Sequence, residues 1–169
     1  AAELNQKPIV GAVLAGFLRV QSDTVNMVNA PFLAKERGIE VREVRNDREG
    51  DYHTLIRVSL KTESGERSVA GTLFGNAQPR LVELFGIKVE ADLAGHMLYV
   101  VNEDAPGFIG RIGTPLGEAG VNIGTFHLGR RDAGGEAVVL LSVDEAVTPE
   151  LVAKVRALPG VKTVMPLKF

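Results

Sequence analysis

The sequence predicts an α+β protein whose two halves have different patterns. In the first half, apolar residues recur at helical spacing near the start and later alternate with polar residues, as in strands. In the second half, strand-like and helix-like segments follow one another in the order βαββαβ. A chain of 169 residues is long enough for one large domain or two small ones, each with a buried core.

Two helices are expected at the start of the chain. The first carries apolar side chains at helical spacing, namely Ile9, Val10, Val13, Leu14, Phe17 and Leu18. Small residues between them permit close approach of another backbone: Gly11, Ala12, Ala15 and Gly16. The second helix is expected to start at Ser22 or Asp23, either of which can cap it, and to end at Gly38. Pro31 removes a backbone donor, so it should kink or divide this helix.

Four strands are expected in the rest of the first half. Residues 39–45 form a strand-like run, and residues 52–60 alternate apolar or β-branched with polar side chains, as in a half-buried strand. Residues 68–74 should return as its hairpin partner, and residues 81–89 hold further strand-like apolar residues. The first half therefore predicts the order ααββββ over residues 1–92.

A short hinge at residues 92–96 precedes the second half. Strands are expected at 96–102, 121–128, 136–143 and 161–167, with helices at 108–119 and from Pro149 to Leu158. Thr148 is placed to cap the last helix, and Pro149 is favoured at its first position. The order βαββαβ is typical of a ferredoxin-like unit, an antiparallel sheet with helices on one face.

Composition excludes several classes of function. A net charge of −2 with mixed acidic and basic residues gives no case for nucleic-acid binding. Without cysteine there is no disulfide, thiolate nucleophile or thiolate metal site, which is compatible with a cytoplasmic protein. The most apolar run, Pro8 to Leu18, is too short to span a bilayer, so no membrane role is expected.

No catalytic constellation is recognisable in the sequence. There is no phosphate loop, no zinc-binding His pair and no dinucleotide-binding glycine motif after a strand. The three histidines, His53, His96 and His127, lie in separate segments without metal-ligand spacing. We therefore predict no catalytic residue and no metal site, and a chain that binds a ligand rather than transforms one.

The most informative stretch runs from Val100 to Phe108. An apolar strand enters an acidic turn, and Pro106-Gly107 then opens a helix whose first N–H groups lack partners and suit a small anion. Asp104 offers a negative charge beside them, so the two signs together fit a zwitterion such as a free amino acid. The alternative is an ordinary strand-to-helix turn with proline at its start.

Four segments of the chain resemble a known family. Residues 25–38 and 68–75 resemble the intervening, or allosteric substrate binding, domain of long-form bacterial D-3-phosphoglycerate dehydrogenase. Residues 107–113 and 120–123 resemble its C-terminal ACT domain. The resemblance implies an intervening domain over 1–92 and an amino-acid-binding, regulatory ACT domain over 96–169.

The resemblance also implies a function. The chain would be a regulatory fragment that binds L-serine as a feedback effector, while the catalytic domains would precede Ala1. The parent enzyme would be a cytoplasmic, NAD-dependent oxidoreductase of L-serine biosynthesis that oxidises 3-phosphoglycerate. The fragment itself would hold no cofactor, and whether it counts as an enzyme stays open.

The family's serine site carries over to Asn102, Asp104, Pro106, Gly107, Phe108, Ile109, Asn122 and Ile123. Asp104 would receive the serine ammonium, backbone N–H groups from Pro106 to Ile109 would hold its carboxylate, and Asn122 would reach the ligand across a subunit interface. Relatives often carry Tyr or His at Asn102, and Arg at Ala105. The alternative is that Asp104 is only an acid favoured at a helix start and Asn122 only a turn residue.

The resemblance implies that the ACT domain pairs with a copy of itself, side by side, into an eight-stranded sheet, within a homodimer or a tetramer of the parent. Arg80 and Lys88 are candidates for a second, anionic effector site, with surface solvation as the alternative. A structural oligomerisation module that binds no effector is the competing hypothesis for the whole chain.

Overall fold

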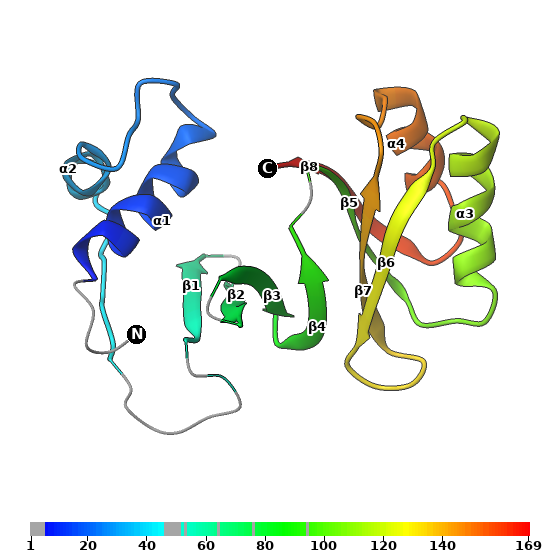
Figure 1. Ribbon diagram of the computed structural model, residues 1–169, viewed down its shortest axis with the longest axis horizontal. Helices are drawn as coiled ribbons and strands as arrows, with labels where there is room; N and C mark the ends of the chain where they lie inside the picture. Colours follow the sequence, from blue (N-terminus) through cyan, green and yellow to red (C-terminus); the bar gives the residue numbers. More distant parts are fainter. Residues whose placement is uncertain (1–5, 46–51, 53, 64, 76, 94) are drawn as a thin grey trace. The chain divides into compact units, whose positions relative to one another are not determined.

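The computed structural model describes residues 6–45, 52, 54–63, 65–75, 77–93 and 95–169. The chain forms two compact units, Ala1–Thr54 and Leu55–Phe169. Helices and two antiparallel sheets make up the described residues, which confirms the predicted α+β class (Figure 1). The predicted order βαββαβ is present, and the first half has the order ααββββ with strands that differ from the four predicted ones. His53 lies outside the described residues.

The first unit is a pair of helices, α1 (Lys7–Arg19) and α2 (Ala30–Glu36). Their shared core consists of Leu14, Ala15, Leu18, Val25, Ala30 and Ala34. Gly11 is required by the packing, because an added Cβ would lie 2.7 Å from the backbone oxygen of Met27. Gly16 has open space around it, so the predicted close approach applies to only one of the two glycines.

The second helix is shorter than predicted. It starts at Ala30, and neither Ser22 nor Asp23 caps it. Instead Asn26 and Asn29 hold the preceding turn, because the Oδ1 of each accepts the backbone N–H of the other, at 2.8 and 3.1 Å. Pro31 lies in the first turn of α2, where its missing donor costs no hydrogen bond.

The predicted strand at residues 39–45 is wrong. These residues have no regular secondary structure, and Val41 and Val44 are exposed. A strand needs a partner for its backbone hydrogen bonds, and no described strand pairs with this segment.

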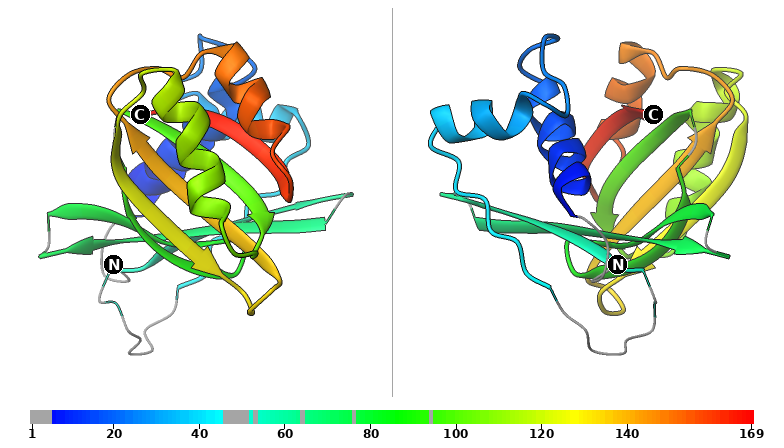
Figure 2. Two further views of the ribbon diagram at one scale, coloured as in Figure 1. Left: turned by 90° about the vertical axis from the view of Figure 1, so that its right-hand side faces the viewer. Right: turned by 60° about the vertical axis from the view of Figure 1, so that its left-hand side comes forward.

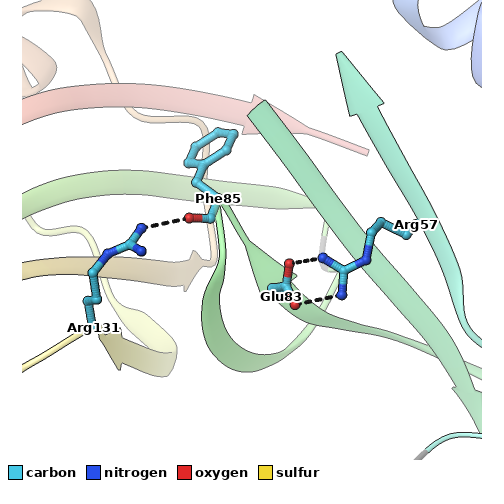
Figure 3. A network of polar contacts seen from close by, with 4 residues as sticks. All are labelled: Arg57, Glu83, Phe85 and Arg131. Atoms are coloured by element: carbon cyan, nitrogen blue, oxygen red, sulfur yellow. Dashed lines mark hydrogen bonds and ion pairs between the residues drawn. The ribbon is translucent and has the colours of Figure 1, made fainter. Parts of the chain in front are cut away.

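The second unit begins with a four-stranded antiparallel meander in the order β1-β2-β3-β4. Its strands are β1 (Ile56–Thr62), β2 (Gly65–Phe74), β3 (Gln78–Leu84) and β4 (Ile87–Asp92). Residues 81–89, predicted as one run, divide at a tight turn in which Phe85 and Gly86 have φ of 52° and 77°. Arg57 and Glu83 form a two-bonded ion pair over the buried Ala70 of the strand between them (Figure 3).

The second sheet has the order β6-β7-β5-β8 and is antiparallel throughout. Its strands are β5 (His96–Glu103), β6 (Ile123–Arg130), β7 (Glu136–Val143) and β8 (Val161–Lys168). Helices α3 (Phe108–Glu118) and α4 (Pro149–Arg156) cover one face of it (Figure 2). The buried residues between this face and the helices are Leu98, Val100, Phe108, Ile112, Leu116, Val139, Leu141, Leu151, Val152, Val155 and Val164.

The start of α4 is capped as predicted. The Thr148 side chain accepts a hydrogen bond from the backbone N–H of Leu151 at 3.3 Å. A hydrogen bond from its own backbone N–H, and then one from Thr148, lower the pKa of Glu150. An ionised carboxylate suits this position because a helix N-terminus carries partial positive charge.

The other face of the second sheet packs against β3 and β4. The buried residues of this second core are Leu84, Ile87, Val89, Ala91, Met97, Tyr99, Val101, Val138 and Leu140. Gly129 of β6 is required here, since an added Cβ would lie 2.3 Å from the backbone oxygen of Lys88. Burial raises the pKa of Tyr99 to about 12, against a smaller opposing effect of Arg67. The two sheets of this unit therefore share one apolar interior.

Candidate functional site

A hollow of about 520 Å³ lies where β5 ends and α3 begins. This volume is within the range of roughly 300–1,000 Å³ that is usual for small-molecule sites. Its lining residues are Asn102, Asp104, Ala105, Pro106, Gly107, Phe108, Ile109, Leu128, Arg130 and Gly134. The end of β6 and the β6–β7 loop therefore complete a site that begins at the β5–α3 junction.

The start of α3 is open to a ligand. Gly107 takes the left-handed conformation with φ of 79°, and no side chain caps the helix. The first hydrogen bond of the i to i−4 type runs from Arg111 to the Gly107 oxygen, at 3.0 Å. The N–H groups of Ile109 and Gly110 precede it, in the turn where a helix has no backbone acceptors of its own. This end of α3 therefore favours an anion.

Asn102 is a polar side chain held inside the protein. Asn102 is only 1% exposed, and its Nδ2 donates to the backbone oxygen of Glu103 at 2.7 Å. Its Oδ1 is buried and accepts no hydrogen bond from the described residues. Because a buried acceptor without a donor costs free energy, this oxygen is suited to a donor that arrives with a ligand.

Asp104 is fixed in orientation by the end of β6 and by the β6–β7 loop. Its Oδ2 accepts hydrogen bonds from Arg130 Nη1 and from the Gly134 backbone N–H, each at 3.2 Å. Its own N–H donates to the Gly135 oxygen at 2.8 Å. The carboxylate thus lies in the hollow together with the open helix start, and the site presents both signs of charge.

Comparison with known proteins gives the family. A family model described as the D-3-phosphoglycerate dehydrogenase intervening domain matches residues 1–85, and one described as the ACT domain matches residues 96–160. The chain belongs to the D-3-phosphoglycerate dehydrogenase intervening-domain family and carries an ACT domain. The hollow lies at the first strand–helix junction of the region that the ACT model matches.

Curated relatives match along nearly the whole chain. The D-3-phosphoglycerate dehydrogenase of Bacillus subtilis is 35% identical over 164 residues, covering 96% of this chain and 31% of the relative. Those of Synechocystis and Methanocaldococcus jannaschii are 32% and 34% identical, covering 98% and 83% of this chain and 30% and 26% of the relatives. The chain thus spans about a third, or less, of the length of these relatives.

Six of the eight predicted effector residues line the hollow, and two do not. Asn122 and Ile123 lie where β6 begins, after the C-terminal end of α3. The hollow lies at the other end of both elements. Asn122 Nδ2 donates to Asp144 Oδ2 at 2.9 Å, which fits a turn residue within a single chain. Within one chain, Asn122 and Ile123 therefore do not line the hollow.

The two candidate anion-site residues lie elsewhere, on β3 and β4. Arg80 forms an ion pair with Asp92, and its guanidinium lies 5.8 Å from the centroid of the Phe74 ring. Lys88 pairs in register with Glu83. Both cations thus have acidic neighbours, and an anion at either of them stays a prediction.

Sequence reasoning missed Leu128, Arg130 and Gly134. Arg130 and Asp104 are 26 residues apart, and no motif links them. The register of the sheet brings them together, because both Asn102 and Arg130 pair with Ala137 on the strand between them. The signal that could have found these residues is the predicted β6–β7 hairpin, because its turn lies beside the end of β5.

No group of three metal-binding side chains occurs among the described residues. His96 and His127, the two histidines in the described ranges, lie on β5 and β6, outside the hollow. Within the same ranges, no helix is long and apolar enough to cross a membrane.

Proposed function

We propose that this chain is the regulatory part of a D-3-phosphoglycerate dehydrogenase and binds L-serine as a feedback effector at an interface between two ACT domains. The relatives that match 96% and 98% of the chain carry that enzyme's name. The observation that carries the proposal is the unpartnered, buried Oδ1 of Asn102 in a hollow that also holds Asp104 and the open start of α3.

Each group of a free amino acid has a counterpart in the hollow. The ammonium pairs with Asp104, whose orientation is set by the end of β6 and by the β6–β7 loop. The carboxylate accepts from the N–H groups at the start of α3. The serine hydroxyl donates to the buried Oδ1 of Asn102, which selects serine over an apolar amino acid of similar size.

Asn122 and Ile123 enter the site only from a second copy of the chain. The ACT sheet has two edge strands, β6 and β8, at which another sheet can add. Pairing of ACT domains side by side would give an eight-stranded sheet and a homodimer, and a tetramer of the parent is the proposed assembly. In such a dimer Asn122 would exchange its bond to Asp144 for one to the ligand.

Effector binding at a subunit interface accounts for regulation. A ligand that contacts two chains binds one arrangement of them better than another, and the difference, typically 1–3 kcal/mol, is available to shift a remote active site. In this proposal NAD binds to the catalytic part of the cytoplasmic parent enzyme, and the regulatory part holds no cofactor.

Calorimetry of the chain with L-serine tests the proposal, after sedimentation has established its oligomeric state. We expect saturable heat from L-serine, at least tenfold weaker binding of L-alanine, and loss of binding in Asp104→Asn. Asp132→Asn is the matched control, since it removes the same charge from the β6–β7 loop, at a residue that does not line the hollow. A folded oligomer that gives no heat at millimolar L-serine would leave the structural oligomerisation module as the function.

A further inference from the structure

Arg130 lines the hollow and contacts Asp104. It is the last residue of β6 and shares a sheet face with Asn102, with Ala137 in register between them. Ala137 is fully buried and carries only a methyl group. The long Arg130 side chain therefore extends over a small residue toward Asp104, as their 3.2 Å contact shows.

The guanidinium of Arg130 has N–H donors to spare for a ligand. One nitrogen, Nη1, donates to Asp104 Oδ2, whereas a guanidinium has five N–H donors in a planar fork. The Arg130 side chain is 58% exposed, and exposed ion pairs are weak. Moving this cation by a small distance to meet a ligand therefore costs little.

The Asp104 carboxylate has a free side as well. Both of its described contacts, from Arg130 and from Gly134, go to Oδ2. Oδ1 accepts no hydrogen bond among the described residues. An ammonium can therefore bind Oδ1 without displacing Arg130, and it then lies next to the guanidinium.

The spacing of these charges suits an α-amino acid. Standard bond lengths place the amino nitrogen about 2.5 Å from the carboxyl carbon of such a ligand. Asp104 and Arg130 present their opposite charges side by side at 3.2 Å. A ligand whose ammonium binds Asp104 thus brings its carboxylate within reach of the guanidinium.

We propose that Arg130 determines the specificity of the effector site by pairing with the ligand's carboxylate, which it shares with the N–H groups of α3. This inference rests on the proposed amino-acid binding. Planar guanidinium forks match carboxylates, so the residue selects free amino acids over amides and esters. Arg130 also holds Asp104 in place, but the ligand's carboxylate is its second partner.

The test compares L-serine with L-serinamide, which keeps the ammonium and lacks the carboxylate. Calorimetry near pH 6, where both amines are protonated, gives the L-serine affinity, and competition against L-serine gives that of the amide. Arg130→Gln should weaken L-serine binding by about fivefold, the upper end for an exposed ion pair, and should change L-serinamide binding less than about twofold. Arg130→Lys should recover part of the loss.

Arg131→Gln is the matched control, because it removes the same charge from the next residue, whose side chain bonds to Phe85 outside the hollow. It should leave both affinities unchanged, and equal melting temperatures of wild type and Arg130→Gln would show intact folding. Equal weakening of both ligands would reduce Arg130 to a residue that orients Asp104. Tighter L-serine binding by Arg130→Gln would mean that Arg130 competes with the ligand's ammonium for Asp104, which would overturn the inference. Unchanged L-serine binding overturns this inference alone, whereas absence of wild-type binding overturns the proposed function.

Discussion

Arg131 Nη2 donates a hydrogen bond to the backbone oxygen of Phe85 at 3.0 Å (Figure 3). Phe85 is the one non-glycine residue with positive φ among the described residues, and it forms the β3–β4 turn. The same β6–β7 loop holds Asp104 through Gly134 and Gly135. One short loop therefore contacts both the candidate effector site and the first sheet.

Replacing Arg131 by glutamine should lower the free energy of unfolding by about 0.5–1.5 kcal/mol, the usual contribution of one hydrogen bond. The Phe85 oxygen is exposed to water once the guanidinium is gone, so a larger loss is not expected. Urea denaturation followed by circular dichroism measures the change. A loss above about 3 kcal/mol would mean that the loop supports more of the fold than this single bond.

The close approach of β6 to β4 should make Gly129 intolerant of a side chain. In Gly129→Ala the new methyl group would meet the Lys88 oxygen at 2.3 Å and Ile87 Cγ2 at 3.0 Å. Separating the two backbones should cost about 1–3 kcal/mol, as overpacking usually does. Gly117→Ala is the control, because the site on α3 is open and alanine favours a helix by about 0.5–1 kcal/mol. Equal unfolding midpoints in urea for the two variants would contradict this packing.

Leu116→Ala should destabilise the chain by about 2–5 kcal/mol, the range for a fully buried leucine. Leu116 packs α3 against the sheet, so the L-serine binding proposed at the start of that helix should weaken as well. Leu93→Ala, at a residue that is 42% exposed, should cost under about 1 kcal/mol. Thermal unfolding of both variants gives the comparison, and a similar loss of stability in the two would contradict the burial of Leu116.

Stability should fall as the pH rises from 10 to 12 because of Tyr99, whose pKa is raised from 10.0 to about 12 by burial. In this interval the phenol ionises in the unfolded chain while it stays protonated in the native one. The unfolded state then binds fewer protons, and the free energy of unfolding decreases by at most about 2–3 kcal/mol. The contribution is fully present below pH 10.

Tyr99→Phe isolates this effect, since it keeps the ring contact with Phe85 and removes the ionising group. Urea denaturation at pH 9 and pH 11.5 should show a smaller loss of stability in the variant than in the wild type. All other groups are the same in both proteins, so their contributions cancel in the comparison. Parallel losses would show that Tyr99 ionises as easily in the folded state as in the unfolded one.

Local signals predicted most of the second half of the chain. Thr148 followed by proline marks the start of α4, and the glycines at 107 and 120, both with positive φ, bound α3. The first half was harder, because residues 39–45 have strand-favouring residues but no partner in the described structure. Local residue preference does not supply a neighbouring backbone.

The candidate site was predictable only where it is continuous in sequence. The run from Asn102 to Ile109 lines the hollow as one segment, so the strand-to-helix turn was enough to suggest it. Arg130 and Gly134 enter through the register of β6 on β7, which no short motif encodes. Asn122 depends on a second chain, so its role as a ligand contact stays a prediction.

The apolar interior shared by the two sheets bears on how the assembly should be studied. A protein cut near residue 95 to isolate the ACT fold would leave Met97, Tyr99, Val101, Val138 and Leu140 without the strands that cover them. Such a fragment would self-associate through exposed apolar surface, whatever the native chain does. Measurements of dimerisation should therefore keep β1 to β4 attached. The association that is measured then cannot arise from core residues that the cut has exposed.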